Sequence, residues 1–157
     1  MNPQSLANHL EEQLRLEISA KQALIECIEA QECALRVQDP EAFTAAVART
    51  EQELVQGRGR TKRREELLEG LAHTWGVPVN TLTLGGVARR LGAGGQALEA
   101  LRLDLRQAVA GVIRRNRRLA ALIGLHRRIN TEICQLVLGC DSPEQVEDGG
   151  ALVNAEA

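Results

Sequence analysis

Residues 4–38 contain neither glycine nor proline, and their aliphatic side chains recur with the period of an α-helix. A stripe with a period close to 3.6 predicts one amphipathic helix, which should begin near Ser5 and end near Gln38. At 1.5 Å per residue this helix would be about 50 Å long, too long to wrap around a globular core. It must therefore lie beside other long helices. The stripe consists of Leu6, Leu10, Leu14, Ile18, Ile25, Ile28 and Leu35.

The composition of the 157-residue chain agrees with a helical protein. With one Phe, one Trp and no Tyr, the chain lacks the aromatic side chains that usually fill β-sandwiches and barrels. A hydrophobic fraction of 44% is too high for a disordered chain. No apolar run approaches the roughly 20 residues that span a bilayer, and the first residues do not resemble a secretory signal. We therefore expect a cytoplasmic protein with no membrane insertion.

A second long helix is predicted from Pro40 to Trp75. Asp39 is suited to cap it, and proline is favourable at the first helical position. Its centre is weak, because residues 57–64 contain two glycines and no aliphatic side chain. This stretch is either a bent part of one helix, which we favour, or a break between two helices.

A short helix and a third long helix follow. Residues 76–80 read as a turn, Thr81 or Thr83 can cap a short helix that ends near Leu91, and residues 92–95 read as a loop. The last helix should run from Gln96 to Leu138, with Gly139 as its natural stop. Its heptad series is interrupted only by Arg115 and His126 and otherwise comprises Leu98, Leu101, Leu105, Ala108, Val112, Leu119, Leu122, Ile129, Ile133 and Leu136.

These elements predict an all-α protein: three long helices in an antiparallel coiled-coil-like bundle, with a short helix before the last one. Residues 1–139 would form the bundle domain. Residues 140–157 are rich in glycine and acidic side chains and poor in apolar ones, so we expect a flexible acidic tail.

Charge is distributed unevenly along the chain. Residues 1–56 carry 4 basic and 10 acidic side chains, residues 57–128 carry 15 and 5, and residues 129–157 carry none and 6. A basic middle segment could bind nucleic acid, or it could pack beside the acidic first helix and be neutralised there. We favour neutralisation, because no aromatic side chains accompany the arginines.

Signatures of catalysis and of metal binding are missing from the sequence. The four cysteines have spacings that are unusual for zinc sites, so we interpret them as buried reduced thiols. His126 has no Ser, Cys or Asp one turn away, and the histidines near Glu12 and Glu69 do not form the Glu-x-x-His pairs of di-metal bundles. We expect no enzymatic activity, no cofactor and no metal.

The layout resembles the FlgN family of flagellar export chaperones. The resemblance rests on the acidic first helix, the Asp39-Pro40-Glu41-Ala42-Phe43 turn, the Arg63–Leu71 segment before Gly76, the Thr81–Leu84 segment and the Arg- and Asn-containing stretch Ile113–Ile123. It implies a chaperone that binds hook-associated (hook–filament junction) proteins, prevents their premature assembly and delivers them to the flagellar type III secretion apparatus. The alternatives are a structural coiled-coil or adaptor protein and, less favoured, an arginine-rich nucleic-acid binder.

The predicted partner-binding surface lies toward the C-terminus, where the last helix has more aliphatic residues than one packing seam requires. Leu119, Leu122, Ile129 and Ile133 would belong to the seam, whereas Ile123 and Val137 would lie on a second apolar face. The full set is Leu119, Leu122, Ile123, Ile129, Ile133, Leu136 and Val137, with Val146, Leu152 and Val153 of the tail as secondary contacts. The expected partners are hook-associated proteins and components of the export apparatus, and the chaperone itself is expected to be a monomer or a homodimer.

Overall fold

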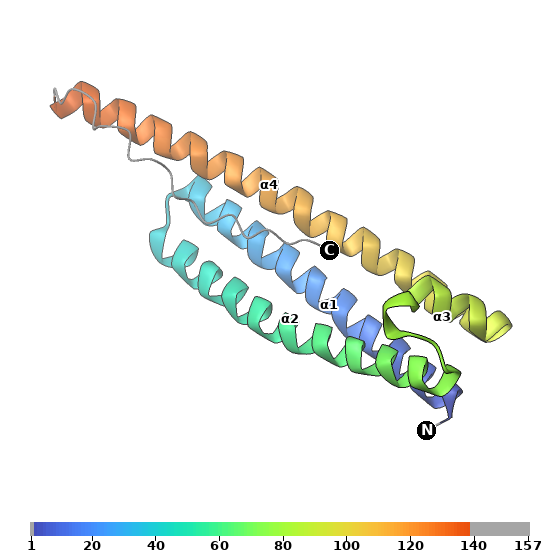
Figure 1. The fold of residues 1–157 in the computed structure, drawn as a ribbon. Helices are drawn as coiled ribbons and strands as arrows, with labels where there is room; N and C mark the ends of the chain where they lie inside the picture. The colour runs from blue at the N-terminus through green and yellow to red at the C-terminus, as the bar shows by residue number, and fades with distance from the viewer. Residues whose placement is uncertain (1, 139–157) are drawn as a thin grey trace. The chain divides into compact units, whose positions relative to one another are not determined.

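The computed structural model describes residues 2–138, and within them helices account for almost every residue and no strand occurs (Figure 1). Three helices are long: α1 (Pro3–Val37), α2 (Pro40–Trp75) and α4 (Gln96–Leu138). Between α2 and α4 lie the short helix α3 (Leu84–Leu91) and two 3₁₀ turns, η1 (Val79–Thr81) and η2 (Gly92–Gly95). The predicted all-α architecture with three long helices is thereby confirmed. The element order differs from expectation in two places: residues 79–81, in and next to the predicted turn, and residues 92–95, predicted as a loop, both form 3₁₀ turns.

Local capping explains where the helices begin. The Asp39 carboxylate accepts a hydrogen bond from the Ala42 amide at 2.9 Å, as the sequence predicts. Thr83, one of the two proposed caps of the short helix, accepts from the Gly86 amide at 3.1 Å. The start at Ser5 was wrong: Asn2 is the cap, and α1 begins at Pro3, whose fixed φ and missing N–H suit the first helical position.

The glycine-containing centre of α2 remains helical. The α1 side chains that contact this stretch, Gln13 and Glu17, are polar. The missing aliphatic side chains of α2 therefore leave no gap in an apolar seam. The Gln13 amide donates to the Arg60 carbonyl oxygen at 2.8 Å, and Arg64 forms an ion pair with Glu17. The favoured interpretation, that residues 57–64 belong to one helix and not to a break between two, is therefore correct.

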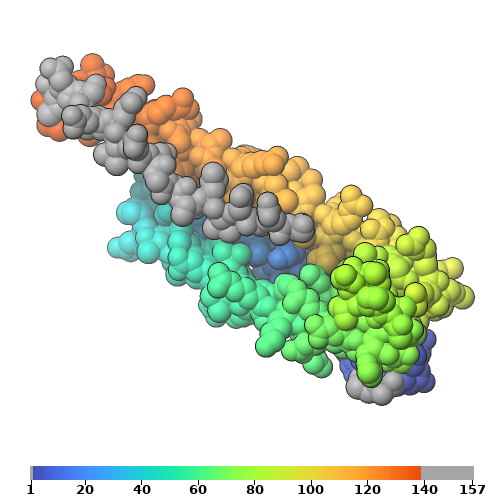
Figure 2. Space-filling model, viewed as in Figure 1, coloured from blue at the N-terminus to red at the C-terminus, as the bar shows by residue number. Residues whose placement is uncertain are grey.

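The hydrophobic core is concentrated where α3 meets the long helices. The largest fully buried side chains are Leu10 and Leu14 of α1, Leu71 of α2, Val87 of α3 and Leu98 of α4. In the space-filling view the green and yellow-green segments around α3 form one continuous mass (Figure 2). This core fixes α3 and the beginning of α4 against the α1–α2 hairpin.

Side-chain pairs between α1 and α4 keep one register. Gly111 lies against Ile25, Arg115 pairs with Glu29 at 2.7 Å, and Arg118 approaches Glu32 at 3.4 Å. The two members of each pair are 86 positions apart in the chain, so α1 and α4 run parallel. Helix α2 returns antiparallel to α1 after the two-residue connection at Gln38 and Asp39.

The chain divides into two units, one ending at Ala120 and one beginning at Ala121. The first contains the helix contacts described above. The described part of the second is the C-terminal portion of α4, residues 121–138. Within residues 2–138 no helix is long and apolar enough to cross a membrane.

The cysteines differ from expectation. Cys27 is buried as predicted, but Cys33 and Cys134 are exposed. An aliphatic neighbour in the sequence does not decide whether a thiol is buried. Cys140 lies outside the described residues.

Candidate binding surface

A row of exposed aliphatic side chains follows the C-terminal portion of α4. Five residues spaced by three or four positions share one side of the helix, because such spacings bring side chains together on an α-helix. We call this row the α4 stripe; it consists of Leu122, Leu125, Ile129, Ile133 and Leu136. Apart from the half-buried Leu122, its members are 44–85% exposed. A soluble domain rarely leaves so many aliphatic side chains in one uncovered row, so the stripe has the character of a contact surface.

Most of the sequence-predicted site residues fall on or beside this stripe. Ile129 and Ile133, which the heptad series assigns to the packed seam, are exposed. Of the two residues assigned to a second face, Val137 is exposed and Ile123 is half-buried. Both flank the stripe by their spacing along α4.

Leu119 is placed differently. It is only 5% exposed and belongs to the part of α4 that precedes Ala121. The three tail residues Val146, Leu152 and Val153 lie outside the described residues. The role of these four in partner binding stays a prediction.

Sequence reasoning missed one member of the stripe, Leu125. The heptad series places His126 at this level, and strict counting passes over its neighbour. The signal was nevertheless present, because Leu125 is three residues after Leu122 and four before Ile129, the spacing of one helix face.

The other side of the same helical portion is polar. A shallow depression there is lined by Ala121, Gly124, Arg127, Arg128, Thr131 and Glu132. The portion is thus amphipathic, with an aliphatic side and a side that carries charge. Amphipathic helices of this kind bind partner helices or grooves through their apolar face.

Two arginines of α4 before Ala121 pair with carboxylates of α1. Arg115 and Arg118 form ion pairs with Glu29 and Glu32. Together with the pair between Arg64 and Glu17, these contacts confirm that the basic middle segment packs beside the acidic first helix. Arginines paired in this way are less available to phosphates, which favours a protein surface over a nucleic-acid surface as the site of binding.

Chemistry that would require a metal has no support in the described part of the chain. No group of three or more His, Cys, Asp or Glu side chains there could hold a metal ion. The buried carboxylates of Glu17 and Glu32 face arginines of neighbouring helices, an arrangement that serves packing between helices. What the surface offers to a ligand is apolar area on a helix.

Comparison with known proteins agrees with this picture. Residues 1–145 match a protein-family model described as FlgN protein. The match covers all of the described residues and most of the chain. Neither the curated proteins nor the solved structures contain a match.

Proposed function

The chain belongs to the FlgN family, a family of flagellar export chaperones rather than of enzymes, and we propose that it binds hook-associated (hook–filament junction) proteins. In this proposal it acts in the cytoplasm, prevents premature assembly of these proteins and delivers them to the flagellar type III secretion apparatus. The observation that carries the proposal is the α4 stripe, a row of aliphatic side chains of which four are exposed.

The stripe suits a helical partner. The backbone of this portion of α4 is hydrogen-bonded within the helix, so strand addition has no free edge on which to form. An amphipathic helix of the cargo can instead pack its own apolar side along the stripe. Full burial of an exposed aliphatic side chain contributes roughly 1.5–3 kcal/mol, and the partly covered members of the stripe contribute less each, so the contact depends on several of them together.

Sequestering a subunit interface explains how such binding prevents assembly. Hook-associated proteins polymerise through contacts between subunits, and a chaperone that covers one of these surfaces keeps the cargo monomeric. In this proposal residues 1–139 form the helical domain and the acidic tail 140–157 adds secondary contacts through Val146, Leu152 and Val153. We propose that the chaperone itself acts as a monomer or a homodimer.

Replacing apolar side chains of the stripe with acidic ones tests this proposal. The double variant Leu125→Asp, Ile129→Asp should lose binding of purified hook-associated proteins in a pull-down and by calorimetry, because the contact would bury unpaired charges. The matched control is Ala121→Asp, Thr131→Asp, which adds the same charge to the polar side of the same helical portion and should bind normally.

The melting temperature of both variants shows whether folding is preserved. If both bind the cargo as well as the unmodified chain does, the α4 stripe is not the cargo surface. If the complex forms but no hook-associated protein remains monomeric in its presence, the anti-assembly role is wrong. An adaptor unrelated to export would bind none of these proteins.

A further inference from the structure

A second surface lies within the first unit, between α3 and the beginning of α4. It is an open groove of about 830 Å³, formed entirely by residues 83–113. The α4 residues that line it run from Glu99 to Ile113, a stretch of about 21 Å or four helical turns. The groove therefore has the length of a short docked helix.

The floor of the groove is apolar. Leu105 is buried, Leu84 and Ala110 are half-buried, and Val109 and Ile113 are exposed aliphatic side chains. By their spacing, Val109 and Ile113 share one side of α4 with Arg102 and Arg106. That side differs from the one that carries the α4 stripe, so the groove is not an extension of the cargo surface proposed above.

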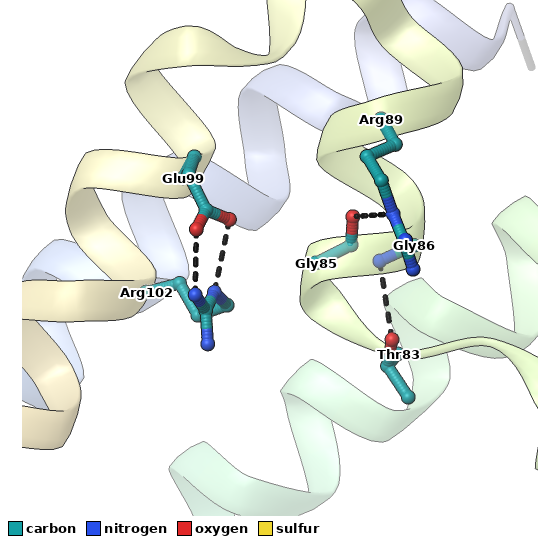
Figure 3. A network of polar contacts seen from close by, with 6 residues as sticks. All are labelled: Thr83, Gly85, Gly86, Arg89, Glu99 and Arg102. Carbon is teal, nitrogen blue, oxygen red and sulfur yellow. Dashed lines mark hydrogen bonds and ion pairs between the residues drawn. The ribbon is translucent and has the colours of Figure 1, made fainter.

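Arginines form the rim, and one of them is held firmly in place. Arg102 donates two hydrogen bonds to Glu99, from Nε at 2.9 Å and from Nη2 at 2.6 Å (Figure 3). Its side chain reaches α3, where a Cβ on Gly85 would lie 3.7 Å from the Arg102 Nε atom. The hydrogen bonds from Arg102, with a smaller contribution from Arg89, lower the pKa of Glu99, so the only acidic side chain of the lining stays ionised and paired.

Two further arginines are not neutralised. Arg106 forms no ion pair with any carboxylate among residues 2–138, and Arg89 on α3 donates its Nε hydrogen bond to the Gly85 carbonyl oxygen at 3.3 Å (Figure 3). With three arginines and one glutamate, the lining carries a net charge of +2. The groove thus combines an apolar floor of helical length with an unbalanced positive rim.

We propose that this groove docks an acidic amphipathic helix of a partner protein. The apolar floor receives the aliphatic side of that helix, and Arg89 and Arg106 face its carboxylates. Charge complementarity selects the partner, because a basic helix of the same apolar pattern would bring like charges together. The groove has no strand edge, which favours a helix over an extended peptide as the occupant.

The test uses the full chain and two labelled 18-residue peptides. Both carry leucine at the same four positions of one helix face, and their remaining polar positions are Glu in one and Lys in the other. Fluorescence anisotropy should show binding of the Glu peptide only, weakening steeply with salt. The double variant Arg89→Glu, Arg106→Glu should weaken that binding by at least about tenfold. The matched control Arg49→Glu, Arg58→Glu makes the same charge change at two exposed positions of α2 and should bind as the unmodified chain does.

Three results would overturn the proposal. If the groove variant and the α2 control lose the same affinity for the Glu peptide, the binding is only unspecific attraction between opposite charges. Binding that appears only when Asp141, Glu144, Glu147 and Asp148 are neutralised in the full chain would assign the groove to the chain's own C-terminal residues. A homodimer that Arg89→Glu, Arg106→Glu dissociates would assign it to a second copy. The groove variant should still bind hook-associated proteins, because its α4 stripe is unchanged. Its cargo binding therefore tests the proposed function independently of these three results.

Discussion

Arg64 on α2 donates a hydrogen bond to the buried carboxylate of Glu17 on α1. This ion pair lies where α2 has no aliphatic side chain, so it replaces apolar packing between the two helices. Glu17 is only 6% exposed, and its second carboxylate oxygen has no hydrogen-bond partner in the structure. The interaction with Arg64 therefore provides much of the stabilisation that offsets the lost hydration of this carboxylate.

Arg64→Met should lower the free energy of unfolding by about 3 kcal/mol, because it leaves the Glu17 carboxylate buried without its partner. The double variant Glu17→Leu, Arg64→Met should recover most of that loss, since two apolar side chains can pack at the same level. Urea denaturation measures both. A double variant that is no more stable than Arg64→Met would show that the arginine acts through something other than the charge of Glu17.

The stability of the protein should depend on pH in part through the ionisation of the same carboxylate. Burial raises the pKa of Glu17 above its ordinary value of 4.5, with Arg64 opposing the shift. The folded state then holds the proton more tightly than the unfolded state, so this group's contribution to stability falls as the pH rises through the interval above 4.5. Subtracting the unfolding free energy of Glu17→Gln from that of the unmodified chain isolates this contribution.

Glu99 provides a control of opposite sign. Its pKa is lowered, chiefly by the hydrogen bonds from Arg102, so its contribution is present above pH 4.5 and is lost as the pH falls below it. The same subtraction with Glu99→Gln should therefore increase with pH. If the two differences change in the same direction as the pH rises, the assigned cause of one of the shifts is wrong.

Gly57 and Gly59 are predicted to be sites where alanine stabilises the protein. Both lie inside α2, neither has positive φ, and a Cβ at either position would meet no atom within 4 Å. Each substitution should raise the free energy of unfolding by up to about 1 kcal/mol, because alanine loses less backbone entropy in a helix. Gly76 ends the same helix with φ of +61°, so Gly76→Ala should destabilise and serves as the control. Thermal melts decide both signs.

Gly95 should tolerate no side chain. A Cβ at this position would lie 2.0 Å from the carbonyl oxygen of Ala88, a backbone atom at the contact between α3 and η2. Gly95→Ala should therefore cost about 3 kcal/mol or more, because the backbone itself has to move. Gly94→Ala is the control, since a Cβ there would come no closer than 3.8 Å to the Gln4 side chain. Equal stability of the two variants in urea would contradict the close approach.

Helix positions could be predicted from the sequence because their determinants are local. The Asp39-Pro40 cap, the Thr83 cap and the aliphatic period of each long helix involve residues within a few positions of one another. The cap of α1 was misplaced by three residues because Asn2 and Ser5 are both acceptable caps, and the fixed φ of Pro3 favours a start directly after Asn2.

The burial of individual side chains could not be predicted in the same way, because it depends on what other helices cover. Leu119 and Ile133 occupy equivalent heptad positions, yet one is buried and the other exposed. Cys27 and Cys33 lie in the same helix and differ likewise. The groove of α3 and α4 has no signal in either helix alone, since its rim combines Arg89 of α3 with residues of α4, which follows after the 3₁₀ turn η2.

The flanks of the α4 stripe lead to a last prediction, which concerns the cargo. Ile123 and Val137 flank the stripe at two positions along the helix, and neither is fully buried: Val137 is exposed and Ile123 is half-buried. Ile123→Asp, Val137→Asp should abolish binding of hook-associated proteins, because a charge at the edge of an apolar contact is desolvated without a partner. Since neither side chain is fully buried, the melting temperature should change little.

Truncation after Gly139 separates the helix from the residues that follow it. If α4 provides the main contact, the truncated chain should lose less affinity than Ile123→Asp, Val137→Asp, and calorimetry with one purified hook-associated protein gives both values. A greater loss on truncation would move the main contact to Val146, Leu152 and Val153. Unfolding of the double variant would show instead that Ile123 and Val137 belong to a packed face, and the contact would then have to be carried by Leu125, Ile129 and Leu136.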